Sequence, residues 1–190
     1  MRNLKSVFTT AVVACLLLPA GALARVPQGQ RSYSGNVFYF GGPRGADATN
    51  FTLTITSLTP PDEVDKIVST LKSDGQNGLM KFIGKQKRGY LQVGTQLARD
   101  VNAVWITDEP EGRKITVVFE RWLGWAEVRA GARSLDYPFT YMEIFLDQKG
   151  KGEGTLIPAA KVRAKSADSL EVENFAIYPA RLTNVKLDKN

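Results

Sequence analysis

The residues best suited to chemistry gather in the stretch 120–129, just past a predicted strand, where two tryptophans lie close to two carboxylates. Tryptophan rings on a loop can stack on sugar rings or line the mouth of an apolar cavity. Arg121, Trp122 and Trp125 are therefore candidate ligand-binding residues. The alternative, which we favour, is that the two tryptophans form a hydrophobic plug that closes one end of a barrel.

A second candidate is Glu143, which lies within a predicted strand over 137–146 and shares a face with Tyr141 and two phenylalanines. A carboxylate on an apolar face is either paired or has a raised pKa. With a raised pKa it could act as a general acid, whereas an ion pair with an arginine such as Arg129 or Arg133 would make it structural. We favour the structural pair and keep Tyr141 and Glu143 as candidate ligand-binding residues.

The composition excludes several kinds of catalytic site. The chain has no histidine, and its one cysteine, Cys15, lies in the N-terminal apolar run. This excludes Ser-His-Asp triads, Cys-His pairs and histidine-ligated metal sites, and we expect no metal and no cofactor. A hydrolase could still use two of Glu120, Glu127 and Glu143, if the pair stood about 5 Å apart for a retaining mechanism or about 6.5–9.5 Å apart for an inverting one.

The N-terminus has the layout of a cleavable secretory signal. Arg2 and Lys5 precede an apolar run over 12–18, and a small-x-small site ends at Ala24. This pattern predicts a signal peptide over 1–24, cleavage after Ala24, and a protein exported to the periplasm or the extracellular space. Acylation of Cys15, as in a lipoprotein, is the less favoured alternative because the apolar run continues past it. No other apolar run approaches the roughly 18 residues of a membrane span, so we expect no transmembrane anchor.

The mature chain over 25–190 has the length of one domain. The predicted signal carries two of the 25 lysines and arginines and none of the 19 acidic residues, so the mature net charge is +4. A charge this small and dispersed argues against nucleic acid as a partner.

Periodicity predicts a mainly β fold, an antiparallel β-barrel or β-sandwich of about 8–9 strands. The strands are expected over 34–40, 51–56, 88–93, 103–107, 114–120, 137–146, 155–164, 169–175 and 181–187. A two-helix segment over about 60–84 interrupts them: Thr59 is the expected N-cap, apolar residues then recur at helical spacing, and Gly75 and Gly84 are the expected stops.

Four segments carry a resemblance to other proteins. From Leu58 onward the chain resembles a group of exported bacterial proteins to which no activity is assigned. The segments are 118–122 (VFERW), 136–143 (DYPFTYME), 152–160 (GEGTLIPAA) and 172–175 (VENF). The resemblance implies a bacterial exported protein and indicates neither an activity nor a site.

Two functions fit these observations best. The first is a non-catalytic binding module that holds a small apolar ligand, a lipid or a glycan inside or at the mouth of the barrel, because the strands are rich in aromatic residues. The second is a structural or envelope-interaction protein with a filled core, whose outer threonines, lysines and arginines meet an envelope partner. The carboxylate-based hydrolase is the third and least favoured.

Overall fold

The computed structural model describes residues 29–42, 45–121, 133–165, 170–175 and 178–188. Its elements in chain order are β1 (Arg31–Gly42), β2 (Gly45–Ile55), α1 (Pro61–Ser73), α2 (Gly75–Ile83), β3 (Gly89–Val93), β4 (Arg99–Val101), β5 (Ala103–Glu109), β6 (Gly112–Glu120), the 3₁₀ turn η1 (Arg133–Asp136), β7 (Phe139–Asp147), β8 (Lys151–Ala164), β9 (Leu170–Asn174) and β10 (Ala180–Leu187).

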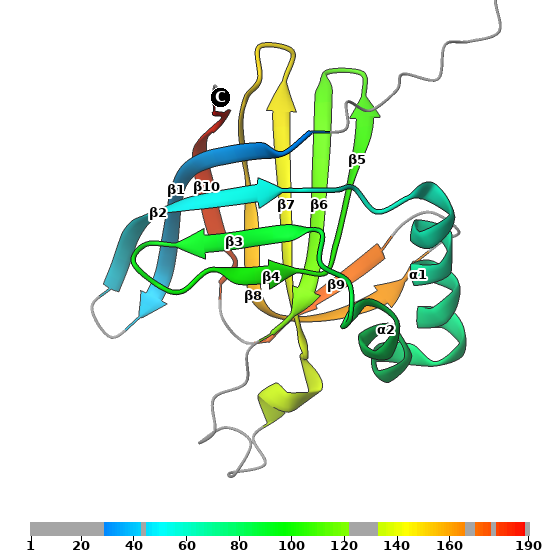
Figure 1. Ribbon diagram of the computed structural model, residues 1–190. Coiled ribbons are helices and arrows are strands. Elements are labelled where there is room, and N and C mark those ends of the chain that lie inside the picture. The colour runs from blue at the N-terminus through cyan, green and yellow to red at the C-terminus, as the bar shows by residue number, and fades with distance from the viewer. Residues whose placement is uncertain (1–28, 43–44, 122–132, 166–169, 176–177, 189–190) are drawn as a thin grey trace, which may run out of the picture.

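All ten strands belong to one antiparallel sheet, which curls into two layers. The strand order is β4-β3-β2-β1-β10-β8-β7-β6-β5, and β9 pairs with β8 outside this path. In Figure 1 the layer of β1 to β4 runs across the layer of β5 to β8, with α1 and α2 on one side. The ten strands confirm the prediction of a mainly β fold. The sheet does not close through hydrogen bonds, so the fold is an open, barrel-like sandwich.

Apolar alternation explains why the two layers face each other. Phe51, Leu53 and Ile55 of β2 are buried on one face, as their spacing of two predicts. They meet Met142 and Ile144 of the other layer. We call the side chains enclosed between the layers the inner cluster. Its fully buried members include Val37, Leu53, Val101, Val104, Ile115, Val117, Met142, Ile144, Leu182 and Val185.

The sheet turns its corner where β1 meets β10, at Gly35. The register of this pair shifts between Ser34 and Asn36, and Asn184 of β10 takes the left-handed backbone conformation with φ 53°. This is a β-bulge, which bends a strand and increases its twist. A Cβ atom at Gly35 would lie 2.8 Å from the Thr183 carbonyl oxygen and 2.9 Å from the Phe51 ring. Glycine therefore permits the close approach of strands at this corner.

The two ends of the sheet, β4 and β5, are joined in the chain by Asn102 alone. Asn102 is buried, and its amide nitrogen donates to the Gln86 carbonyl at 2.9 Å. Its amide oxygen accepts from the Glu120 backbone N–H at 2.8 Å. The Asn102 side chain thus holds together the corner between β4 and β5, two strands that are consecutive in the chain but do not pair with each other.

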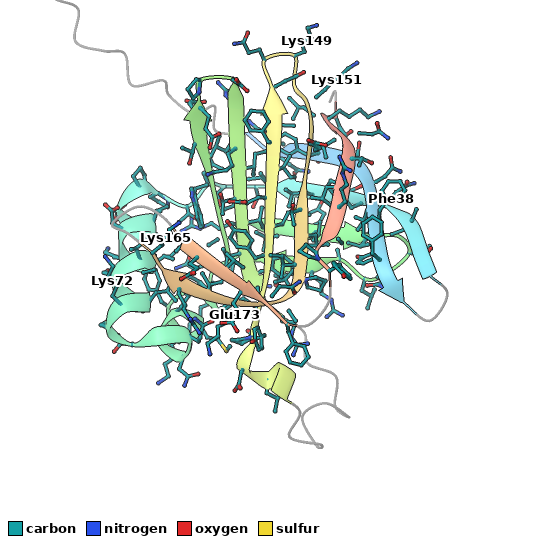
Figure 2. The ribbon with its side chains drawn as sticks, turned by 180° about the vertical axis from the view of Figure 1, so that it is seen from behind. Phe38, Lys72, Lys149, Lys151, Lys165 and Glu173 are labelled. Carbon is teal, nitrogen blue, oxygen red and sulfur yellow. The ribbon has the colours of Figure 1, made fainter. Side chains whose placement is uncertain are left out.

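The two helices cover one part of the outer face of the β5 to β8 layer. Their apolar stripes pack on outward-facing strand residues to form what we call the outer cluster. Its buried members are Ile67, Leu71, Leu79, Ile83, Ala103, Val118, Phe139, Tyr141, Ile157, Ala160 and Val162. The tip of the β7–β8 hairpin, marked by Lys149 and Lys151, lies away from the helices (Figure 2). Among the described residues, no helix combines the length and apolar character needed to cross a membrane.

Side chains in and next to the helices also form hydrogen bonds with backbone groups of the strands. Thr59 was expected to cap α1, and this is wrong: the N-cap is Pro60, without a side-chain capping bond. The Thr59 hydroxyl instead accepts from the Val104 N–H at 2.8 Å, and the Thr59 N–H donates to the Val104 carbonyl at 2.7 Å. On α2, Gln76 hydrogen-bonds to both backbone groups of Val162 on β8.

Other boundaries differ from the prediction in detail. The sheet has ten strands rather than 8–9, because β4 was not expected. β2 begins at Gly45, ahead of the expected 51. Gly75 follows Asp74, the C-cap of α1, and has φ +63°, so it stops the first helix as predicted, but α2 begins directly at this glycine. Helix α2 therefore covers Gly75–Ile83 rather than only the last five of these residues.

Candidate functional site

The sequence-predicted site is only partly within the described structure. Trp122 and Trp125 lie outside the described residues, so the plug and the ligand-binding alternatives both stay predictions. Arg121 directly follows β6, is half-buried, and donates its backbone N–H to the Pro138 carbonyl at 2.8 Å. Glu143 pairs in register with Thr116, five residues before Arg121. The structure therefore does not bring Arg121 and Glu143 together.

Tyr141 and Glu143 do come together, on the outer face of β7. The Tyr141 hydroxyl donates to Glu143 Oε1 at 2.5 Å. Burial, and then this hydrogen bond to a carboxylate, raise the pKa of the Tyr141 phenol. Glu143 thus has a hydrogen-bond donor on its own strand, whereas the side chains of Arg129 and Arg133, its expected partners, lie outside the described residues. A phenol with a raised pKa keeps its proton, so the pair is suited to holding a fixed geometry.

The surroundings of Glu143 are charged and open. A shallow hollow of about 490 Å³ is lined by Glu143, Phe145, Thr155, Lys114 and Arg181, among others. Lys114 pairs with Glu109 at 3.2 Å, and Arg181 pairs with Glu153 at 3.1 Å. Exposed pairs such as these contribute little stability. The hollow is the solvated end of the outer face, where the helices no longer cover the sheet.

The proposed hydrolase carboxylates can be compared by register. Glu143 lies opposite Thr116, four residues from Glu120 along β6. At about 3.3 Å per residue the two Cα positions stand roughly 13 Å apart. Glu120 Oε2 lies beside Gly84 at the end of α2, whereas Glu143 lines the hollow beside Lys114, so the two carboxylates do not meet at the separations that glycosidases use. Glu127, the third carboxylate, lies outside the described residues. Glu120 and Glu143 therefore do not form a glycosidase pair.

Between the layers, the described side chains of the inner cluster are buried and packed together, and a larger hollow than the one near Glu143 opens at the surface. A groove of about 980 Å³ opens between the β2–α1 linker and β5, and we call it the β5 groove. Its volume is in the range of small-molecule sites. Its apolar walls are Ile55, Leu58, Pro60, Pro61, Val64, Trp105 and Ile106, and its charged residues are Arg31, Asp65 and Arg88.

The local folding of three segments explains the β5 groove. Ile106 points toward the inner cluster and Trp105 toward the outer cluster, because successive residues of β5 face opposite ways. Leu58 lies in the linker, held where the Thr59–Val104 bonds tie the linker to β5. Beyond the Thr59–Val104 hydrogen bonds the linker and β5 separate. Leu58, Trp105 and Ile106 are therefore left half-buried at the surface.

The β5 groove is mixed in charge. Arg88 lies 2.6 Å from Glu63 Oε2 of α1, and only 16% of the Arg88 side chain and 26% of the Glu63 side chain are exposed. Arg31 is half-buried and has no ion-pair partner among the described residues. Asp65 is exposed at the rim. The groove can therefore hold an apolar body beside a negatively charged group near Arg31.

The sequence interpretation missed the β5 groove. Its residues come from 55–65, Arg31, Arg88 and 105–106, and no local pattern joins these segments. One signal was present: Trp105 stands between Val104 and Ile106, so strand alternation places a large aromatic ring on the face opposite theirs. An outward tryptophan on an edge strand indicates a contact surface.

In the described part of the chain, no group of three or more acidic, histidine or cysteine side chains is placed to hold a metal ion. No family model matches the chain, and comparisons with curated proteins and with solved structures found no match.

Proposed function

We propose that the chain is an exported, non-catalytic binding module that holds the apolar part of a ligand in the β5 groove. One observation carries this proposal: Leu58, Val64, Trp105 and Ile106 are left half-buried around a groove of about 980 Å³. Apolar side chains gathered in a concave surface gain free energy when a ligand removes them from water, by about 25 cal/mol per Å².

The chemistry of the groove favours a lipid or another amphiphile with an anionic group over a glycan. Most of its wall is aliphatic or aromatic, and Arg31 offers a positive charge beside that wall. A glycan would need more hydrogen-bonding side chains around an aromatic platform. The hollow near Glu143 has such polar side chains, with Phe145 as the ring, but it is smaller and more open.

A second function, an envelope-interaction protein, is favoured by the filled interior. The inner cluster leaves the layers packed against each other, so the groove and the exposed faces are what the protein offers to a partner. The two functions differ in whether the groove receives a small molecule or part of a protein.

Export is part of the proposal, supported by the N-terminal pattern. The first strand starts at Arg31, shortly after the expected cleavage site at Ala24, so cleavage there would leave the described sheet intact. Mass spectrometry of the protein from an envelope fraction should find a mature N-terminus at Arg25. An acylated Cys15 at the N-terminus would establish a lipoprotein instead.

The binding proposal is tested on the mature protein by native mass spectrometry and by titration with dodecanoate, displacing an anilinonaphthalene sulfonate dye. We expect a stoichiometric apolar ligand in the native spectrum, or dye displacement by dodecanoate. Val64→Lys places a charge in the groove at a half-buried position of α1 and should weaken binding at least roughly tenfold. Tyr90→Ala, which removes an exposed aromatic ring elsewhere, should leave binding unchanged. A bare protein mass together with no dye binding would contradict the proposal.

A further inference from the structure

The outer edge of β5 has main-chain groups that face away from the sheet. β5 is an end strand and pairs only with β6. Both backbone groups of Val104 bond to Thr59, so they point away from β6. In an antiparallel pair this orientation repeats every second residue, which gives the N–H and C=O of Ile106 and Asp108 the same outward direction. No described residue hydrogen-bonds to these groups.

Thr59 already occupies the position of one residue in an added strand. It exchanges two hydrogen bonds with Val104, one through its backbone N–H and one through its hydroxyl. The β5 groove begins directly beyond this point, beside Trp105 and Ile106. From Ile106 onward, therefore, none of the residues that the structure describes pairs with the edge along which a further strand would lie.

The walls of the β5 groove fit the alternation of a strand. A strand laid along β5 sends successive side chains to opposite faces. On one face they would meet Ile106 and Leu58, which adjoin the inner cluster, and on the other Trp105, which adjoins the outer cluster. Val64 of α1 lies in the same wall of the groove. An extended segment with apolar side chains on both faces therefore finds apolar contacts on both sides.

A second copy of β5 fits this edge poorly. Symmetric antiparallel pairing centred on Ile106 needs Val104, which is bonded to Thr59. Pairing centred on Asp108 sets two carboxylates opposite each other and uses Pro110, which has no N–H. Pairing centred on Thr107 sets each Asp108 carboxylate against an Ile106 side chain. Like charges and charge-on-apolar contacts are unfavourable across strands.

Charge indicates one more feature of the occupant. Arg31 lines the groove, is half-buried, and has no ion-pair partner within 4.0 Å among the described residues. A carboxylate on the bound segment, either an acidic side chain or a C-terminus, would complement it.

On the basis of the second proposed function, in which the groove receives part of an envelope partner, we infer that this part is an extended, largely apolar polypeptide segment that adds as a strand to the edge of β5. Its main chain bonds to Ile106 and Asp108, its side chains enter the β5 groove, and its carboxylate lies near Arg31. The added strand would fill the opening that the uncompleted sheet leaves beside β5.

The test uses the mature protein and a phage library of random eight-residue peptides with free C-termini. We expect selected peptides, made synthetically, to bind and to slow amide hydrogen exchange at Ile106 and Asp108. Ile106→Pro removes one outward N–H at an edge position that tolerates proline, and it should weaken binding roughly tenfold or more. Ile106→Val, the matched control, should bind as the wild type does. If Ile106→Pro does not fold, Asp108→Pro replaces it.

Amidating the C-terminus of a selected peptide, or mutating its acidic residue, should weaken binding if that carboxylate meets Arg31. In the Arg31→Gln variant the same change to the peptide should leave the affinity unchanged. Peptides that bind Ile106→Pro as tightly as wild type, or leave both amides unprotected, would overturn strand addition. Failure to select any peptide would also overturn it. In that case dye displacement by dodecanoate decides separately whether the groove still binds an apolar ligand.

Discussion

Thr59 and Val104 are joined by two hydrogen bonds that tie the start of the helical segment to an end strand. The Thr59 hydroxyl accepts from the Val104 N–H at 2.8 Å, and the Thr59 N–H donates to the Val104 carbonyl at 2.7 Å. Thr59 is 6% exposed and Val104 is fully buried, so water does not compete at this contact. The pair fixes where the linker leaves β5 and therefore where the β5 groove begins.

Replacing Thr59 by valine should destabilise the fold by about 2 kcal/mol. The substitution keeps the shape of the side chain but removes the acceptor, and a buried N–H without a partner costs about 1–3 kcal/mol. Urea denaturation should show a lower midpoint with an unchanged m value. Thr59→Ser keeps the hydroxyl and should lose less than half as much. Equal losses for the two variants would show that the hydroxyl does not matter.

Asn102→Leu should be more costly, about 3 kcal/mol. Its amide satisfies the Gln86 carbonyl and the Glu120 N–H, and leucine leaves both without a partner at the corner between β4 and β5. Asn50→Ala removes an exposed side chain whose amide oxygen accepts from the Asn36 side chain, and it should stay within about 0.5 kcal/mol of wild type. The comparison is made by urea denaturation, and similar effects for the two variants would argue against Asn102 as the corner fastening.

Runs of apolar residues in the sequence predicted those strands that are covered on both faces. In β7, Met142 and Ile144 belong to the inner cluster while Phe139 and Tyr141 belong to the outer cluster. Most positions of this strand are apolar, on both of its faces, which is what a strand covered on both sides requires. The same reasoning placed Tyr141 and Glu143 on one face, where they form a hydrogen bond.

The order of strands and the groove could not be predicted, because they depend on partners far apart in the chain. β1 pairs with β10, so that Tyr33 lies opposite Leu187, and neither local sequence indicates the other. Thr59 shows the same limit: its type and position suit a helix N-cap, yet its hydroxyl bonds to Val104. A buried strand edge competes for that hydroxyl, and only the tertiary fold brings the edge near.

The Arg88–Glu63 pair should couple more strongly than exposed pairs. The nitrogen and oxygen are 2.6 Å apart, with side chains 16% and 26% exposed. Breaking a buried pair costs about 3–5 kcal/mol, and the remaining exposure reduces the expected coupling to about 1–3 kcal/mol. A double-mutant cycle with Arg88→Met and Glu63→Gln measures it.

The matched control is the helical pair Lys66–Asp62, whose side chains are 61% and 71% exposed. Its coupling should be about 0.3–0.5 kcal/mol and should vanish in 1 M salt. A coupling energy for Arg88 and Glu63 no larger than that of the control would mean that solvent screens the buried pair as well.

Tyr141 should make the protein less stable as the pH rises above 10. In the unfolded chain its phenol ionises near pH 10, whereas burial and the hydrogen bond to Glu143 raise its pKa in the folded protein. The unfolded state therefore binds fewer protons than the folded state above pH 10. The stability contributed by this group is fully present below pH 10 and falls above it, by about 1.4 kcal/mol per pH unit. Tyr39, whose pKa burial also raises, adds to the same decline.

Tyr141→Phe separates this effect from the rest of the alkaline decline. At pH 7 the variant should be less stable by about 1–2 kcal/mol, because it loses the hydrogen bond to Glu143. Above pH 10 its stability should fall less steeply, so the two proteins converge as urea denaturation is repeated at rising pH. Tyr178→Phe, at a tyrosine that is 76% exposed, should follow the wild-type curve throughout. Parallel curves for Tyr141→Phe and wild type would mean that Tyr141 ionises in the folded protein as readily as in the unfolded chain.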